Sequence, residues 1–177
     1  IFVVDATSLS VAGEIKVGQS PSGLAVTPDG TLLLTADRDS DQVSVVNLTT
    51  RVAEMTIKVG SRPFGITISA DGTRAYTANV GSDDVTVIDI PGRKVIGAVK
   101  VGRRPYAVAL SIGKVFVTDQ YDGTVSVFDA SSHATLKSIE VCDHPEGIEQ
   151  SAVDGSVYVA CWGDNELVKI DPKTLEI

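Results

Sequence analysis

Two arginines and two aromatic residues flank a proline that recurs along the chain. Arg62 precedes one copy of this proline and Phe64 follows it, and Arg104 and Tyr106 flank the next copy in the same way. An arginine can bind a carboxylate or a phosphate through paired hydrogen bonds, and aromatic rings offer stacking surfaces. These four residues are therefore candidates for holding a small anionic ligand or an acidic segment of a partner protein. The alternative is that both arginines are solvated loop residues paired with nearby aspartates.

The equivalent positions of a fourth copy carry His144 and Glu146, which place a base and a carboxylate on one short loop. Such a pair can serve general acid–base chemistry. The chain has only one other histidine, His133, and it contains no nucleophile elbow, phosphate-binding loop or dinucleotide-binding motif. The sequence therefore leans against an enzyme, and we expect no catalytic residue, metal site or cofactor.

The two cysteines form the clearest covalent candidate. Cys142 stands where the other copies have glycine, and Cys161 stands where they have aspartate or asparagine. Both departures fall in one repeat, at the facing ends of neighbouring expected strands, which favours a disulfide. The alternatives are two buried thiols or a soft-metal site completed by His144. Trp162, the only tryptophan, follows directly and either contacts a ligand or packs over the cysteine pair.

These candidates lie in the loops of an internal repeat. A Val-Gly-x-x-Pro motif ends at Pro21, Pro63 and Pro105, and a degenerate copy ends at Pro145, so the repeats are 42, 42 and 40 residues long. Each repeat contains four short apolar runs separated by turn residues, and no segment keeps a helical period for about ten residues. Four strands in every period of about 40 residues are typical of a β-propeller blade.

Turn residues punctuate each repeat. An Asp-Gly pair joins the first two strands in three repeats, at Asp29-Gly30, Asp71-Gly72 and Asp154-Gly155. This dipeptide predicts type I′ hairpin turns, which require positive φ at both residues. The third strand is followed by an Asx residue expected to cap the next turn, at Asn47, Asp89, Asp129 and Asp171.

The frame Val-Gly-x-x-Pro, Asp-Gly, Tyr-Val-x-Asn and Val-x-Val-Ile-Asp resembles the YVTN-type β-propeller repeats of bacterial periplasmic and archaeal cell-surface proteins. Its best matches here are Tyr76-Thr77-Ala78-Asn79 and Tyr158-Val159-Ala160, and the resemblance covers the whole chain. It implies an all-β, WD40-like β-propeller of four-stranded antiparallel blades, in a ring of about seven blades. It also implies a periplasmic, extracellular or cell-surface setting, in line with a disulfide.

The alignment of the two ends bears on how much of a ring is present. Ile1 aligns with the start of a third strand and Ile177 with the start of a fourth. We expect a single propeller segment, about four blades of a larger ring, with approximate blade phases 1–18 (partial), 19–60, 61–102, 103–142 and 143–177. The alternative is a complete small propeller or an arc closed by oligomerisation. An open arc would expose apolar blade faces and could self-associate.

Composition excludes several classes of protein. The 177 residues are 43% apolar, which fits a folded domain rather than a disordered chain. A net charge of −8 argues against a general nucleic-acid binder. No apolar run approaches the roughly 18 residues of a membrane span. We therefore expect no nucleic-acid partner and no transmembrane segment.

A propeller would gather the blade-entry loops and the loops between second and third strands on one face. The sequence then predicts a channel-mouth rim formed by Arg62, Phe64, Arg104, Tyr106, His144 and Glu146. The expected function is non-catalytic binding of a partner protein or a small anionic ligand by a scaffold of the cell envelope. The alternative is the propeller domain of a larger periplasmic enzyme, a lyase or a quinone- or haem-associated oxidoreductase, with metal or cofactor groups partly outside this segment.

Overall fold

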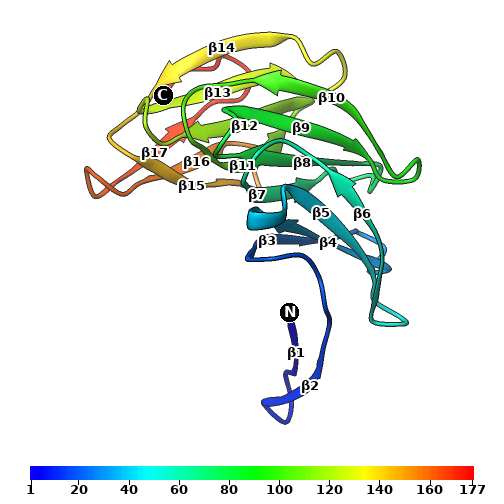
Figure 1. Ribbon diagram of the computed structural model, residues 1–177. Coiled ribbons are helices and arrows are strands. Elements are labelled where there is room, and N and C mark those ends of the chain that lie inside the picture. Colours follow the sequence, from blue (N-terminus) through cyan, green and yellow to red (C-terminus); the bar gives the residue numbers. More distant parts are fainter.

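The computed structural model describes residues 1–177 as an all-β chain of separate antiparallel sheets (Figure 1). The strands are β1 (Phe2–Asp5), β2 (Ser10–Glu14), β3 (Pro21–Val26), β4 (Leu32–Asp37), β5 (Gln42–Asn47), β6 (Val52–Lys58), β7 (Pro63–Ile68), β8 (Arg74–Asn79), β9 (Asp84–Asp89), β10 (Lys94–Lys100), β11 (Pro105–Ser111), β12 (Lys114–Asp119), β13 (Thr124–Asp129), β14 (Thr135–Glu140), β15 (Pro145–Gln150), β16 (Val157–Cys161) and β17 (Glu166–Ile170). One 3-10 turn, η1 (Arg38–Ser40), is the only helical element.

Each sheet is built from strands that follow one another along the chain. Strands β3–β6, β7–β10 and β11–β14 form three four-stranded sheets, which we call blades 1, 2 and 3. Strands β15–β17 form a three-stranded sheet, blade 4, and β1 pairs with β2 alone. The expected all-β architecture of four-stranded antiparallel blades is confirmed.

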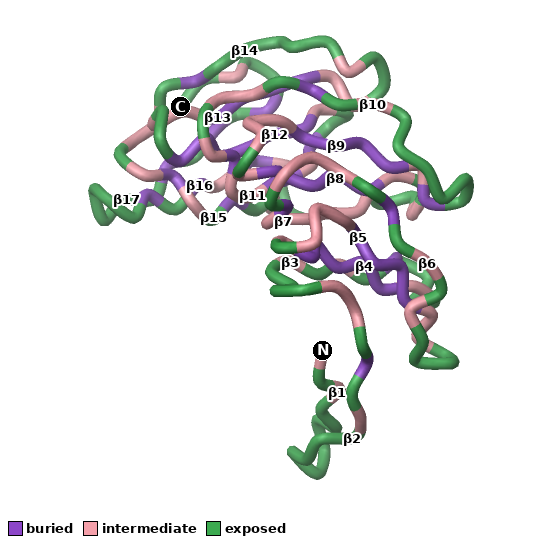
Figure 2. The backbone as a smooth tube through the Cα atoms, viewed as in Figure 1, coloured by how far each residue is buried: buried purple, intermediate pink, exposed green.

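Burial explains why the middle strands are runs of β-branched residues. In blade 1 every residue of β4 after Leu32 is buried, and so are the four central residues of β5, whereas the outer strand β6 is largely exposed. Figure 2 shows the same contrast, with buried middle strands and exposed outer strands. Strands covered on both faces lose the apolar–polar alternation, because neither face meets water.

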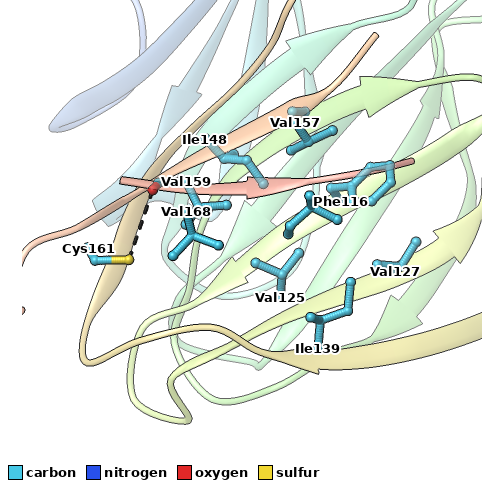
Figure 3. Close-up of a cluster of buried hydrophobic side chains, with 11 residues drawn as sticks. Phe116, Val125, Val127, Ile139, Ile148, Val157, Val159, Cys161 and Val168 are labelled. Carbon is cyan, nitrogen blue, oxygen red and sulfur yellow. Dashed lines mark hydrogen bonds between the residues drawn. The ribbon is translucent and has the colours of Figure 1, made fainter. Parts of the chain in front are cut away.

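Each blade buries itself against the next one. Apolar clusters join blade 1 to blade 2, blade 2 to blade 3 and blade 3 to blade 4. In the last of these, Phe116 and Val125 of blade 3 pack with Val159 and Val168 of blade 4 (Figure 3). The inner strands also adjoin in order, β3 with β7, β7 with β11 and β11 with β15. The blades therefore succeed one another about a common axis, as in a propeller.

Two glycines let neighbouring inner strands approach closely. A Cβ atom on Gly23 would overlap the carbonyl oxygen of Phe64, and one on Gly65 would overlap that of Tyr106. The equivalent Gly147 of blade 4 has open space beyond a contact of 3.6 Å with Ala160. The glycines of blades 1 and 2 are thus required by the stacking of the next blade.

The blades do not close into a ring of four. The β1–β2 hairpin pairs with neither β3 nor β17, and it projects away from the blades in Figure 1. Apolar side chains remain exposed on it, with Phe2 at 68% and Val11 at 64% of full exposure. Leu24 and Val26 of β3 are exposed as well. The chain is an open succession of blades, and the closed small propeller is not formed.

The hairpin turns at the Asp-Gly pairs differ from the prediction. Only the glycine of each pair has positive φ, 71° at both Gly30 and Gly72, so type I′ was wrong here. The reason is the aspartate side chain: Asp71 accepts hydrogen bonds from the backbone N–H and the hydroxyl of Thr73 and from the hydroxyl of Ser69. These bonds stabilise a longer turn with the aspartate at negative φ.

Two consecutive residues with positive φ occur in blade 3 instead. Ile112 (40°) and Gly113 (74°) form the two-residue turn between β11 and β12, in the repeat that is two residues shorter. A β-branched residue in the left-handed region is a genuine conformational outlier.

The turn after the third strand follows the prediction. The expected Asx side chains all accept backbone N–H bonds there: Asn47, Asp89, Asp129 and Asp171.

Candidate functional site

The structure places all six predicted rim residues at one end of the blades. There the loop entering a blade is bonded to the loop between its second and third strands. The N–H of Val80 donates to the carbonyl of Arg62, that of Gln120 to Arg104, and that of Trp162 to His144, each at 3.1 Å. These bonds fix the rim residues against a second loop.

The residue before each recurring proline adopts the left-handed conformation, with φ of 54° at Arg62, 55° at Arg104 and 50° at His144. A carboxylate from the preceding blade holds the peptide N–H of each arginine. Asp41 accepts from Arg62 at 2.7 Å and Asp83 from Arg104 at 2.9 Å. These aspartates thus bind backbone rather than guanidinium groups.

Neither rim arginine forms an ion pair. The guanidinium of Arg62 is exposed and donates no intramolecular hydrogen bond. By contrast Arg103, which directly precedes Arg104, pairs with Asp122 at 2.6 Å. Arg104 donates to the hydroxyl of Tyr121 at 2.9 Å, and its guanidinium carbon lies 4.8 Å from the centre of that ring. Pairing with nearby aspartates, the alternative given above, does not occur at Arg62 or Arg104.

The two rim aromatics meet across the boundary between blades 2 and 3. The ring centroids of Phe64 and Tyr106 are 4.3 Å apart, with an interplanar angle of 38°. Both residues are half-buried, so one side of the pair remains accessible. The pair therefore offers a rigid apolar surface within the same loop face as the two arginines.

His144 and Glu146 do not form the acid–base pair that their spacing allowed. The Nδ1 of His144 lies 2.6 Å from Oδ1 of Asp143. The side-chain amide of Gln120 donates to Glu146, and the hydroxyl of Thr118 donates to the Glu146 carbonyl at 2.9 Å. Glu146 thus contacts blade 3, and no base and acid converge on a common point here.

The structure brings together a second aromatic group, Tyr121, His144 and Trp162, which was not predicted from the sequence. Tyr121, at the tip of the β12–β13 loop, lies with its ring centroid 6.4 Å from that of His144, which lies 5.8 Å from that of Trp162. Trp162 is 70% exposed and Tyr121 is 54% exposed. Trp162 is therefore a surface residue that meets His144 edge-on. Tyr121 could have been suspected because it is an aromatic residue in a loop otherwise rich in acidic and small residues.

Cys142 and Cys161 form the predicted disulfide, with their Cα atoms 5.9 Å apart. In blade 1 the same two positions carry Gly18 and Asp37, and the Gly18 N–H donates to the Asp37 carboxylate at 3.0 Å. Blade 4 replaces this loop-to-strand hydrogen bond with a covalent link. No free thiol remains, so the soft-metal alternative has no thiolate ligands.

A buried carboxyl group lies directly beneath the rim. Asp119 is fully buried, and its Oδ2 accepts from the hydroxyls of Ser126 at 2.6 Å and Thr124 at 3.0 Å. Its Oδ1 has no hydrogen-bond partner. Burial raises the pKa of Asp119 to about 6, and the two hydroxyl bonds only partly oppose this.

Hollows also lie at the opposite end of the blades, near the hairpin turns. One of about 370 Å³ lies between Asp29, Asp71 and Arg93, and another of about 400 Å³ lies beside Ile112 and Lys114. Both hollows are lined by Asp71, whose carboxylate already accepts hydrogen bonds from Ser69 and Thr73. These bonds lower the pKa of Asp71 to about 2. These hollows therefore offer few free polar groups, and the rim remains the better candidate.

No group of three or more His, Cys, Asp or Glu side chains in the chain is arranged to hold a metal ion. No helix of this chain has the length and apolar character needed to cross a membrane.

Comparison with known proteins identifies the fold but no family. No family model matches the sequence, and no curated protein is significantly similar to it. A chain of the hydrazine synthase of Kuenenia stuttgartiensis matches with a TM-score of 0.82 and 27% identity, over 97% of this chain and 56% of that one. A functionally unknown protein of Desulfotomaculum acetoxidans matches with a TM-score of 0.79 and 18% identity, over 96% of this chain and 60% of that one. The chain thus spans less than two thirds of either structure, and these likenesses support the propeller-like fold.

Proposed function

We propose that this chain is a non-catalytic binding module of the cell envelope, which holds a partner protein or a small anionic ligand at its rim. The observation that carries the proposal is the pair of guanidinium groups, on Arg62 and Arg104, that no carboxylate neutralises. Phe64 and Tyr106, whose ring centroids are 4.3 Å apart, follow these arginines by two residues along the chain. Charged forks next to an apolar surface suit a ligand that carries a carboxylate or a phosphate.

The disulfide and the YVTN-type resemblance support the proposed setting. Disulfides persist mainly in oxidising compartments such as the periplasm and the cell exterior. Membership of the YVTN-type repeat group is likewise our proposal, and it rests on the quoted motifs and on the stacked blades. A binding scaffold is a common use of such repeats, but a fold alone does not define a function.

A second candidate function is the propeller domain of a larger periplasmic enzyme. It is favoured by the match to the hydrazine synthase chain, which covers nearly all of this chain at 27% identity. In that case the reacting groups would lie outside residues 1–177. An absorbance spectrum and metal analysis of the purified full-length protein separate the two, because a stoichiometric chromophore or metal favours the enzyme.

Calorimetric titration with inorganic phosphate, citrate and a hexaglutamate peptide tests the binding proposal. The variant Arg62→Ala/Arg104→Ala should weaken binding of the best probe at least tenfold. A matched control, Lys94→Ala/Lys173→Ala, removes two exposed charges from the opposite end and should bind as the wild type does. The proposal fails if the wild type binds none of the three probes, or if the rim variant binds them unchanged.

A further inference from the structure

One continuous row of side chains crosses the boundary between blades 3 and 4 at the rim end. It comprises Arg104, Tyr121, His144 and Trp162, and we call it the aromatic row. The Arg104 guanidinium lies over Tyr121, and the rings of Tyr121, His144 and Trp162 then follow one another at centroid distances of 6.4 and 5.8 Å. Blade 3 supplies the first two members and blade 4 the last two.

Two members of the aromatic row, Tyr121 and Trp162, are large exposed aromatic residues, and the other two, Arg104 and His144, are half-buried. Tyr121 and Trp162 are each more than half exposed, whereas the buried Tyr76 is only 1% exposed. Single exposed apolar residues are ordinary on protein surfaces, but a contiguous set marks an interaction surface. Tyrosine, tryptophan and arginine are also the residue types that most often dominate binding energy at interfaces.

We infer that the aromatic row binds an extended peptide segment of a partner protein, with an acidic residue at the Arg104 end and an apolar residue at the Trp162 end. This inference rests on the proposed function and names the partner. An extended chain advances about 6.7 Å for every two residues, close to the ring spacings of the row. Alternate side chains of one extended segment can therefore meet successive members.

The two ends of the aromatic row differ in charge, which sets the polarity of the peptide. Arg104 carries a guanidinium that pairs with no carboxylate. At the other end Asp143 lies against His144, and Asp164 accepts the N–H of Asp143 at 2.7 Å. A carboxylate is therefore favoured near Arg104 and disfavoured near Trp162, where an apolar side chain fits.

The disulfide holds the last two members of the row in register. Cys142 is two residues before His144, and Cys161 directly precedes Trp162. The covalent link thus joins the two loops that carry these rings, and a preorganised surface loses less conformational entropy on binding. Reduction of the disulfide should weaken peptide binding several-fold.

Selection from a randomised heptapeptide display library on the oxidised wild-type protein tests the inference. The enriched peptides should carry Asp or Glu about four residues away from an apolar residue, because Arg104 lies over Tyr121 and Trp162 is two ring spacings further along the row. Binding of the best peptide, measured by calorimetry, should weaken at least tenfold in Tyr121→Ala/Trp162→Ala and in Arg104→Gln. Fluorescence of the sole tryptophan follows the same binding in the wild type and in Arg104→Gln. Val153→Ala, a change at a 96% exposed residue of the opposite end, should bind as the wild type does.

The outcomes separate this inference from the proposed function. Enrichment of no peptide, or of peptides whose affinity is unchanged in Tyr121→Ala/Trp162→Ala, overturns the aromatic row as a peptide site. If small anions still depend on Arg62 and Arg104 in that case, the proposed function stands alone. Equal thermal unfolding midpoints of the variants and the wild type establish that lost binding is not lost folding.

Discussion

At the scale of single residues, Asp119 connects burial to pH. Its carboxyl group keeps a proton up to about pH 6 in the folded chain, but only to about its ordinary value of 3.8 in the unfolded chain. The folded state therefore binds this proton more tightly, and the stabilisation it gives is complete below pH 4. It is lost as the pH rises from about 4 to 6.

Replacement of Asp119 by Asn should raise the free energy of unfolding at pH 7 by up to about 3 kcal/mol, because a neutral amide pays no ionisation penalty. Blade 2 already carries Asn79 at this position, fully buried and bonded to the Thr86 hydroxyl. The gain should vanish below pH 4. Urea unfolding of both proteins at pH 3.5, 5 and 7 measures it, and a gain independent of pH would contradict the assignment.

Some site residues could be predicted from their position in the repeat, and others could not. Cys142 and Cys161 were found because both depart from the pattern in one repeat, which put them on facing strand ends. The partner of Glu146 could not be found, since Gln120 belongs to the preceding blade and only stacking brings the two together. Contacts within a repeat follow from spacing, whereas contacts between repeats depend on how blades are rotated about the axis.

At the scale of the elements, the disulfide of blade 4 shows what the other blades could carry. A Cβ atom built on Gly102 would lie 2.7 Å from the Cβ of Asp119. The two Cβ atoms of a disulfide are about 3.8 Å apart, so a shift of about 1 Å would fit the bond. The variant Gly102→Cys/Asp119→Cys should therefore form a second disulfide. It should stabilise the oxidised protein by up to about 3 kcal/mol relative to Asp119→Cys alone, which keeps only the native disulfide.

Thiol titration of this variant under denaturing, non-reducing conditions should find no free thiol. The single variant Gly102→Cys serves as the control and should show one. Two free thiols in the double variant would show that the entry loop and the second strand of blade 3 are not held as they are in blade 4.

The glycines of the inner strands give a second test at this scale. Gly65→Ala should destabilise the protein by about 2 kcal/mol or more, because its Cβ would overlap the backbone of blade 3. Gly147→Ala makes the same chemical change where the space is open, and it should alter stability by less than about 1 kcal/mol. Thermal unfolding of the two variants compares them directly, and equal losses would argue against close stacking of blades 2 and 3.

The number and order of the strands followed from the repeat, because apolar runs and turn residues are local signals. The geometry of the hairpins did not. The Asp-Gly pair of the second repeat was expected to form a two-residue turn. Instead the Asp71 carboxylate accepts hydrogen bonds from the Ser69 hydroxyl and the Thr73 N–H, which favour a longer turn. In blade 3 the shorter connection forces Ile112 into positive φ, which its side chain alone would not suggest.

At the scale of the whole molecule, the open succession of blades leaves apolar faces without a partner. Phe2, Val11, Leu24 and Val26 are all substantially exposed at the N-terminal side. The isolated chain of 177 residues should therefore self-associate as its concentration rises. Sedimentation velocity measures this, and Leu24→Lys/Val26→Lys should shift the chain towards the monomer. A concentration-independent monomer of the unsubstituted chain would contradict the expectation.

The apolar clusters between successive sheets also grow along the chain. They contain 3 buried residues where the first hairpin meets blade 1, then 7, 9 and finally 11 between blades 3 and 4. In a linear array each unit is held only by its neighbours, so the weakest contact opens first. Fraying should start at the N-terminal hairpin and spread towards the cross-linked last blade, and amide hydrogen exchange should slow progressively in the same direction.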